Sequence, residues 1–393
     1  MPLPDRPMRV TMVNKYYWPP HLGGVETHLR DISEGLVEYS GAHVRAIVCN
    51  ESAERVEETI DGVEVVRLPR QFALSSAPIA LSMPAALRAE MRRPSPPDIM
   101  HFHFPYPWGE LSFLRAKPDV PSVVIYHSDI VRQKRMLAAY NPFLERFLDS
   151  VDLIMASSPN MVEHSPYLAA RADKCRVVNF GLHVERVAGT AETLARAEAL
   201  RAPHAGRKIV LFVGRLIYYK GADVLVRAMA DVDADLVMIG RGPLESELRE
   251  IAVAAGMAGR ITWLGPQTDA ELAAWYHAAD VFALPSVARS EAFGLVQIEA
   301  HAAGTPVVST NLTTGVPYAN LDGVTGLIVP VGDSPALAGA LNKLLTDDEL
   351  RTRLGRQARE RALTEFTIPR MVEQTQQVYA EAIDLHAARR GRA

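Results

Sequence analysis

Two carboxylates, Glu291 and Glu299, stand on either side of a predicted helix start. Gly294 allows the backbone to turn tightly into this helix, and Gly304 can close it in a left-handed conformation. The helix is therefore expected to cover residues 295–303 and to carry the second carboxylate, with the first in the loop before it. Because both acids lie near one helix end, they are candidates for a common binding site.

The amino-terminal end of this helix is a candidate phosphate site. The first N–H groups of a helix have no partner within it, and their partial positive charge attracts anions. A carboxylate beside a phosphate is better suited to accept hydrogen bonds from sugar hydroxyls, as the acidic residue of a dinucleotide-binding fold does for ribose. Two acids eight positions apart also occur on solvated surfaces, so the pair alone leaves a surface role open.

Two cations, Arg215 and Lys220, lie in the same half of the chain. They follow residues 208–214, an apolar run typical of a buried parallel strand. Ligands of open α/β sheets bind beyond the carboxyl ends of the strands, where both side chains are expected. A guanidinium and an ammonium there could stabilise the charge that develops on a departing nucleoside diphosphate. The alternative is that both are solvated loop charges.

The elements that must position these residues alternate between strand and helix along the second half of the chain. This alternation, with helices of roughly 10–15 residues, predicts a doubly wound parallel sheet. Helices are expected at 222–232, 243–255 and 269–278, and strands at 234–240, 261–264 and 280–285.

The first half begins with the same arrangement. An apolar strand pattern at residues 8–14 is followed by Gly23 and Gly24 and then by a helix. A glycine pair lets the backbone approach a ligand without obstruction by side chains, so a second phosphate-binding loop is expected here.

Histidines accompany two further strand patterns of this half. His101 and His103 belong to the first pattern and are interpreted as core residues. His127 directly follows the second pattern, whose end is expected to point into a cleft between two domains. His127 is therefore the candidate for a ligand contact.

Together these motifs resemble those of glycosyltransferase family 4, which contains retaining enzymes of the GT-B fold. Glu291 and Glu299 match the family's E-x7-E signature, and Arg215 and Lys220, each beside a glycine, match its G-R-(x)n-K-G element. The resemblance is strongest at residues 210–329 and covers nearly the whole chain. It implies an α/β protein with two Rossmann-like, doubly wound parallel-sheet domains that face a cleft.

The resemblance assigns each motif a role in binding a nucleotide-sugar donor. Glu291 and His127 would contact the transferred sugar, and Glu299 would bind the ribose. Arg215 and Lys220 would stabilise the diphosphate and, with Glu291 and His127, form the catalytic group. The remaining implied donor contacts belong to the glycine loop, the strand end near the nucleotide base and the helix start: Gly23, Gly24, Trp263, Leu264, Phe293, Gly294, Leu295 and Val296.

The implied reaction moves a hexose of the mannose or glucose type from a GDP- or UDP-linked donor, with retention at the anomeric carbon. In the family the departing phosphate takes the acceptor's proton, and no other general base stands out here. No ligand set for a divalent ion is evident, so neither a metal nor a further cofactor is expected. Residues 315–318 depart from the family's usual Gly-Gly-Pro-Glu, a departure also reminiscent of transferases that build bacterial surface polysaccharides.

The acceptor is expected to be a glycan or a lipid-linked molecule such as a polyprenyl-diphosphate-linked glycan, in polysaccharide, lipopolysaccharide or glycolipid biosynthesis. A soluble small-molecule acceptor and a sugar-nucleotide epimerase of the same fold are the alternatives. An inactive binding partner would not need to keep both acids and both cations. A dehydrogenase is disfavoured because Glu245 occupies the place of the third glycine after Gly240 and Gly242.

Length and composition agree with two domains. With 393 residues, 48% hydrophobic and 22% charged, the chain is expected to form two globular domains of about 190 residues. We expect an acceptor-binding domain at 1–185, an interdomain linker at 186–206 and a nucleotide-sugar-binding domain at 207–365. A helix within 366–393 is expected to return to the first domain and to end in a disordered tail at 389–392.

Charge and cysteine content exclude several classes of protein. The net charge is −4 and neither half is basic, which argues against nucleic acid as a partner. Cys49 and Cys175 provide neither a disulfide framework nor metal-binding spacing. The first residues lack a signal-peptide core, and no 18-residue apolar stretch could span a bilayer. A cytoplasmic location is expected.

One segment, Gln71–Leu87, carries no charge and is flanked by Arg70 and Arg88. Such a segment could rest on the anionic inner face of the cytoplasmic membrane, making the enzyme peripheral, or cover an apolar acceptor. Equally, it could hold a helix packed in the core. The sequence leaves both interpretations open.

Overall fold

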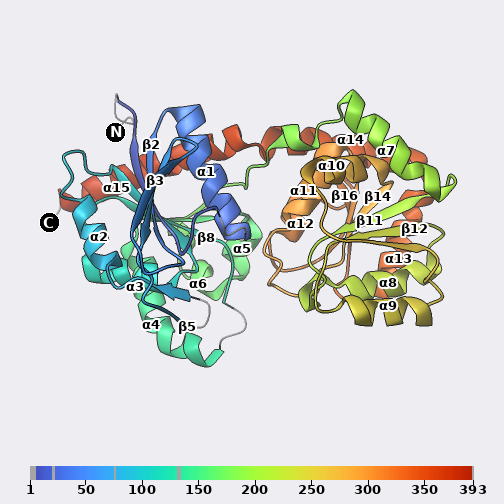
Figure 1. The fold of residues 1–393 in the computed structure, drawn as a ribbon, viewed down its shortest axis with the longest axis horizontal. Helices are drawn as coiled ribbons and strands as arrows, with labels where there is room; N and C mark the ends of the chain where they lie inside the picture. The colour runs from blue at the N-terminus through green and yellow to red at the C-terminus, as the bar shows by residue number, and fades with distance from the viewer. Residues whose placement is uncertain (1–5, 20–22, 75–76, 131–133, 392–393) are drawn as a thin grey trace. The chain divides into compact units, whose positions relative to one another are not determined.

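The computed structural model describes residues 6–19, 23–74, 77–130 and 134–391 (Figure 1). The chain forms two compact units. The first comprises Met1–Gly181 and Ile368–Ala393, and the second comprises Leu182–Thr367.

The first unit contains an eight-stranded sheet in the order β10-β9-β8-β7-β1-β2-β4-β3. All neighbouring strands are parallel except β3 and β4, which form an antiparallel pair at one edge. Chain order changes direction between β1 and β7, which are direct neighbours in the sheet. The strands are β1 (Arg9–Val13), β2 (His43–Cys49), β3 (Val56–Ile60), β4 (Val63–Leu68), β7 (Ile99–Phe104), β8 (Ser122–Tyr126), β9 (Leu153–Ala156) and β10 (Cys175–Val177).

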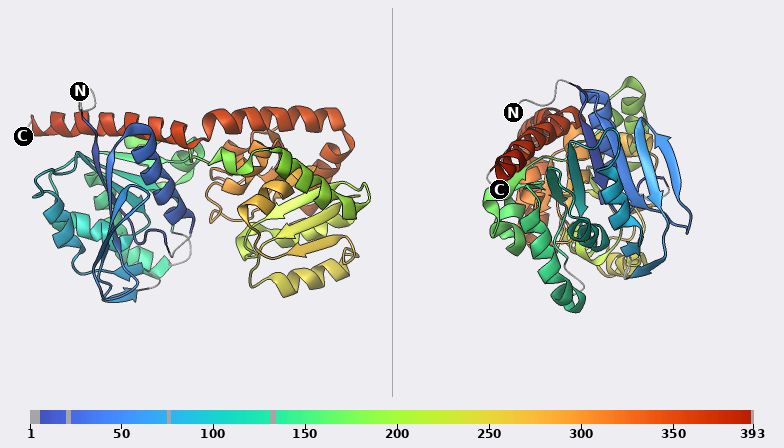
Figure 2. Two further views of the ribbon diagram at one scale, coloured as in Figure 1. Left: turned by 45° about the horizontal axis from the view of Figure 1, so that its top comes forward. Right: turned by 90° about the vertical axis from the view of Figure 1, so that its left-hand side faces the viewer.

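Helices cover both faces of this sheet (Figures 1 and 2). They are α1 (Gly24–Ser40), α2 (Met83–Glu90), α3 (Pro107–Ala116), α4 (Lys134–Ser150), α5 (Pro159–His164), α6 (Pro166–Ala169) and α15 (Ile368–Arg390). The last of these, although distant in sequence, packs against α1, β8 and β9. Gly35 in α1 allows this close packing, because a Cβ there would lie 2.7 Å from the Ile368 side chain.

The end of α15 differs from the expected disordered tail. The helix continues through Arg390, and Arg389 forms an ion pair with Asp152 of the first unit. Arg390 also lies 2.8 Å from Asp119. Asp152 and Asp119 are ion-pair partners that the local sequence does not reveal. Positive side chains are also stabilised by the dipole at the carboxyl end of a helix.

The second unit contains six parallel strands in the order β13-β12-β11-β14-β15-β16. The strands are β11 (Ile209–Val213), β12 (Asp235–Ile239), β13 (Ile261–Leu264), β14 (Val281–Leu284), β15 (Val307–Thr310) and β16 (Gly326–Val329). The order reverses between β11 and β14, which is the switch point where doubly wound sheets bind ligands.

The helices of the second unit are α7 (Ala191–Arg201), α8 (Ala222–Ala228), α9 (Glu245–Ala254), α10 (Asp269–Ala278), α11 (Leu295–Ala303), α12 (Val316–Ala319), α13 (Ser334–Thr346) and α14 (Asp348–Glu365). Residues 186–206, expected as a linker, include α7, which packs against α10. The predicted bounds of β13 and α10 are confirmed. The helix expected at 222–232 is shorter, because a 3₁₀ turn over Met229–Asp231 follows α8.

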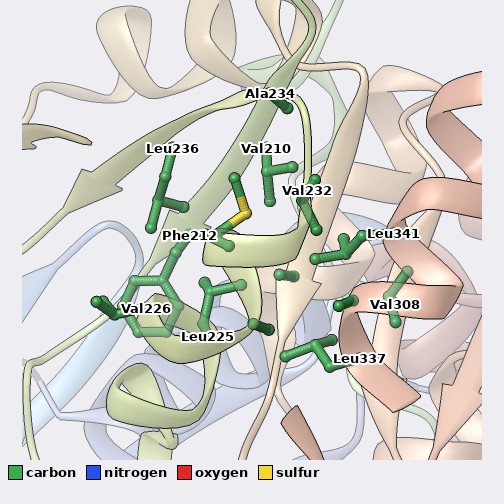
Figure 3. Packing of buried hydrophobic residues seen from close by; sticks show 14 of the residues in the cluster. Val210, Phe212, Leu225, Val226, Val232, Ala234, Leu236, Val308, Leu337 and Leu341 are labelled. Atoms are coloured by element: carbon green, nitrogen blue, oxygen red, sulfur yellow. The ribbon is translucent and has the colours of Figure 1, made fainter. Parts of the chain in front are cut away.

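Buried aliphatic and aromatic side chains hold the second unit together (Figure 3). Val210 and Phe212 of β11 contribute to this cluster along with Leu225 of α8 and Leu337 and Leu341 of α13. The predominantly apolar strand β11 is thus covered on its face by helices, as its sequence pattern predicted.

The uncharged segment Gln71–Leu87 forms a hairpin in its first part and enters a helix in its last part. Its first part forms a hairpin of β5 (Phe72–Leu74) and β6 (Ala77–Ile79), and Phe72 and Leu74 are 52% and 58% exposed. In its last part, Met83 and Leu87 of α2 are fully buried. The core interpretation therefore holds for α2, while the hairpin presents apolar side chains at the surface. Among the described residues, no helix combines the length and apolar character needed to cross a membrane.

Candidate active site

Two loops of the second unit leave the sheet at its switch point. The loop after β11 carries Arg215 and Lys220, and the loop after β14 carries Glu291. Because β11 and β14 are adjacent and parallel, their carboxyl ends lie side by side. Sheet topology therefore brings together residues that are far apart in sequence.

Backbone contacts hold these two loops against each other. Gly221 has a φ of +65°, and a Cβ at this position would lie 2.0 Å from the carbonyl oxygen of Pro285. Val287 N–H also donates a 2.8 Å hydrogen bond to the Tyr219 carbonyl. The glycine after Lys220 is therefore required both by its left-handed conformation and by the close approach of the β14 loop.

Lys220 and Glu291 form a buried ion pair. Lys220 Nζ lies 2.6 Å from Glu291 Oε2, and their side chains are only 11% and 9% exposed. The Ser286 hydroxyl donates a 3.0 Å hydrogen bond to the same carboxylate. The Lys220 side chain runs beside Gly214, where a Cβ would lie 3.4 Å from Cε. A cation and a carboxylate are thus held within one small site.

Helix α11 starts directly beside this pair. Its bounds, Leu295–Ala303, are those predicted, and Gly294 and Gly304 at its ends have φ values of +76° and +87°. No side chain of the described residues caps its first turn, because Gly294 is the N-cap residue. The N–H groups at Leu295 and Val296 follow this turn, so the helix start can hydrogen-bond an anion.

Glu299 lies on α11 and is tied to a residue that the sequence analysis did not identify. The Tyr276 hydroxyl, in α10, donates a 2.5 Å hydrogen bond to Glu299 Oε2. Burial raises the pKa of Glu299, while the Tyr276 hydrogen bond and Lys220 oppose that shift. Tyr276 is itself fully buried. A tyrosine near the end of a predicted helix carries no signal of this contact, because the partner is 23 residues away.

Three other predicted donor contacts of this unit, Arg215, Trp263 and Leu264, occupy less enclosed positions. Arg215 is exposed and lies outside the hydrogen-bonded group of Lys220, Glu291 and Ser286. Trp263 and Leu264 end β13, two strands from β11, and both are half-buried. The Arg249 guanidinium lies 4.7 Å from the centre of the Trp263 ring. The Trp263 ring thus already has a cation–π partner within its own unit.

Phe293 packs between the loop that carries Glu291 and the segment at 315–318. It is buried, and its ring lies 5.9 Å from that of Phe366. A Cβ at Gly315 would lie 2.5 Å from the Phe293 ring, and Gly315 N–H donates to the Ala292 carbonyl. The segment 315–318, which departs from the family pattern, therefore buttresses the loop through its glycine.

The remaining predicted residues belong to the first unit. Gly23 is the N-cap of α1 and Gly24 its first residue, and a Cβ at Gly23 would lie 2.4 Å from Glu26 Oε2. His127 directly follows β8 and is 6% exposed, with Nε2 3.1 Å from His103 Nδ1. Burial lowers the pKa of His127 well below its usual value, so the imidazole is neutral at pH 7. His101 and His103 are buried, as expected for core histidines.

Comparison with known proteins agrees with these two units. The model of the family Glyco_transf_4, Glycosyltransferase Family 4, matches residues 22–186, and that of Glycosyl transferases group 1 matches residues 198–361. Over 377 residues, the chain is 33% identical to O-antigen chain mannosyltransferase C of Escherichia coli, covering 96% of this chain and 99% of the relative. It is also 33% identical over 360 residues to D-rhamnosyltransferase WbpZ of Pseudomonas aeruginosa, covering 92% of each chain.

The fold is shared with a solved structure. Sucrose-phosphate synthase from Thermosynechococcus elongatus matches with a TM-score of 0.77 and 25% identity, covering 95% of this chain and 98% of that chain. The same two α/β units therefore occur in a glycosyltransferase of known structure. From its family matches and a relative aligned over almost its full length, the chain is a glycosyltransferase of family 4, the glycosyl transferases group 1, with the GT-B fold.

Proposed function

We propose that this glycosyltransferase moves a hexose of the mannose type, with retention, from a GDP- or UDP-linked donor to a glycan carried on polyprenyl diphosphate. The observation that carries the proposal is the Lys220–Glu291 ion pair beside the start of α11. It places a cation, a carboxylate and helix N–H groups at the switch point of a doubly wound sheet.

Each group has a separate task in this proposal. Lys220, Arg215 and the N–H groups of α11 stabilise the charge of the departing diphosphate, which is most valuable where water is excluded. Glu291 accepts hydrogen bonds from the transferred sugar, and Glu299 accepts one from the ribose. His127 donates to or accepts from the same sugar as a neutral imidazole. The departing phosphate receives the acceptor's proton, so the protein needs no separate base.

The choice of sugar rests on the relatives. The two reported above are named for transfer of mannose and of D-rhamnose, which is the 6-deoxy form of mannose. A donor of the mannose series is therefore the first to test, and bacterial surface polysaccharide, including lipopolysaccharide, is the pathway class proposed.

Exposed apolar side chains of the hairpin, and of Leu81 shortly after it, support a lipid-linked acceptor. Phe72, Leu74 and Leu81 are each more than half exposed, on the unit expected to bind the acceptor. Exposed apolar side chains are favoured at a membrane surface, and neighbouring arginines add about 1 kcal/mol each beside anionic lipid. We therefore place the enzyme at the cytoplasmic face of the membrane, as a peripheral protein.

The proposal is tested by incubating the enzyme with GDP- and UDP-linked hexoses and a polyprenyl-diphosphate glycan, in buffer containing EDTA. Release of nucleoside diphosphate identifies the donor, and the anomeric coupling in the product distinguishes retention from inversion. Lys220→Met is the matched inactive control, since it keeps the stem of the side chain and removes its charge. Inverted product, or strict dependence on Mg²⁺ or Mn²⁺, would contradict the mechanism. Transfer to a soluble sugar alone would contradict the lipid-linked acceptor.

A further inference from the structure

Three buried histidines of the first unit meet at one point. His28 comes from α1, His103 from β7 and His127 from the residue after β8. One ligand nitrogen of each lies within 4.8 Å of those of the other two. We call these three residues the histidine cluster.

The spacing within the histidine cluster is close to that of a metal site. His103 Nδ1 and His127 Nε2 are 3.1 Å apart and form a hydrogen bond, which a metal ion bound to both nitrogens would replace. Two imidazole nitrogens that bind one tetrahedral zinc ion at about 2.0–2.1 Å lie roughly 3.3 Å from each other. The His28 ring centre is 5.0 Å from that of His127 and 5.6 Å from that of His103, so its nitrogens can approach the same point.

Several nitrogens of the histidine cluster have no hydrogen-bond partner among the described residues. Neither nitrogen of His28 has a hydrogen-bond partner among the described residues, and neither does Nε2 of His103. Buried polar atoms are normally paired, so an unpaired imidazole that is 5% exposed calls for a ligand, an ion or a water molecule.

The surroundings favour a cation of the transition series. Asp31, one turn after His28 in α1, interacts electrostatically with His28 and favours positive charge there. Lys15, whose charge opposes a cation at His127, is itself paired with the buried Glu26 at 3.2 Å. Imidazole ligands select zinc, copper or nickel, whereas magnesium and calcium prefer oxygen ligands.

We propose that His28, His103 and His127 form a binding site for Zn²⁺, and that the bound ion inhibits transfer by competing with the donor sugar for His127. The inhibitory role rests on the proposed function, in which His127 contacts the transferred sugar. The ion would replace the hydrogen bond between His103 Nδ1 and His127 Nε2, and the proton of that bond would move to the other nitrogen of its ring. The ion would then hold the His127 ring between His28 and His103. Turnover itself would need no metal.

The site is tested first without any donor. The full-length, metal-free protein is titrated with Zn²⁺ by calorimetry and with Co²⁺ by visible absorption, where tetrahedral coordination gives intense bands. One ion per chain is expected for the wild type, with at least a ten-fold loss of affinity in His28→Phe. His43→Gln is the control, because His43 is an exposed residue outside the histidine cluster and should leave binding unchanged.

Thermal unfolding of His28→Phe shows whether the variant is folded, and His103→Leu repeats the test from a second element. Binding that is equal in wild type and in both variants, or that Mg²⁺ displaces, would overturn the site. Equal loss in His43→Gln would show that surface histidines hold the ion and would overturn it as well.

The inhibitory role is tested separately. Zn²⁺ should inhibit nucleoside diphosphate release, with an apparent inhibition constant that rises in proportion to donor concentration, and EDTA should restore the rate. One Zn²⁺ bound per chain without any change in donor affinity would overturn the competition. Absence of transfer from every hexose donor in metal-free buffer would instead count against the proposed function, and the calorimetric result would stand independently.

Discussion

Burial of the ion pair between Lys220 and Glu291 costs desolvation free energy, which other interactions must offset. Both side chains are about nine-tenths buried, and desolvation of two charges can exceed their mutual attraction. Ser286 offsets part of that cost by hydrogen bonding to the carboxylate. In the proposed function, donor phosphate replaces the carboxylate as the partner of Lys220.

Replacement of the two carboxylates should separate their roles. Glu291→Gln should lower kcat by at least a hundred-fold and leave the affinity for free nucleoside diphosphate unchanged or increased, because Lys220 loses its resident partner. Glu299→Gln should instead weaken that affinity by about 1–3 kcal/mol through a lost ribose contact. Steady-state kinetics and calorimetry measure both. Equal losses of nucleotide affinity in the two variants would contradict the assignment.

Tyr276 should act as a positioning residue for Glu299. Tyr276→Phe removes the hydrogen bond to Oε2 and frees the carboxylate to rotate, so nucleotide affinity should fall by about 1 kcal/mol with little change in kcat. Tyr17→Phe is a matched control, because the buried Tyr17 hydroxyl has no hydrogen-bond partner among the described residues. If Tyr276→Phe leaves nucleotide affinity intact while Glu299→Gln lowers it, the carboxylate needs no such support.

At the scale of the element, α11 depends on the glycine at its start. Gly294 combines a φ of +76° with a Cβ position only 2.6 Å from Leu284 Cδ2. The first feature is an intrinsic cost for any other residue, whereas the second depends on packing against β14. The helix that presents N–H groups to the site is therefore fixed in place by its N-cap.

Gly294→Ala should destabilise the protein by more than the intrinsic cost of about 1–2 kcal/mol for alanine in a left-handed conformation. Gly256→Ala isolates that intrinsic cost, because Gly256 has a φ of +71° and no heavy atom within 4 Å of its Cβ position. Urea unfolding of both variants gives the difference, and calorimetry should show weaker nucleotide binding only in Gly294→Ala. If both variants lose the same free energy of unfolding, the Leu284 side chain moves away from the new Cβ without an energetic cost.

At the scale of the whole molecule, the apolar hairpin and the adjacent Leu81 should govern membrane association. The wild type should float with anionic liposomes at low salt, and Leu74→Glu combined with Leu81→Glu should remain unbound. Both side chains are more than half exposed, so the change should not disturb folding. Val253→Glu is the control, since Val253 is 67% exposed in the second unit. If the double variant still floats with the liposomes, these side chains do not mediate membrane association.

Local sequence was sufficient to predict several elements of the fold. The helix at 295–303, the strand at 261–264 and the helix at 269–278 have the predicted bounds. Each is delimited by residues with strong local preferences, such as the glycines around α11 and the Thr268 side chain that caps α10. The two acids and two cations were chosen as candidates because their spacing resembles a family motif, and their roles stay predictions.

Tertiary structure alone decided which of these residues touch. Lys220 meets Glu291 because β11 and β14 are neighbours, and strand order is not encoded in the local pattern of either strand. The same holds for Tyr276 beside Glu299, and for His28 among the other histidines. The division of Gln71–Leu87 into buried helix and exposed hairpin likewise depends on what packs against it. Periodicity and capping act over a few residues, whereas these contacts join segments separated by tens of residues and exist only once the sheets are assembled.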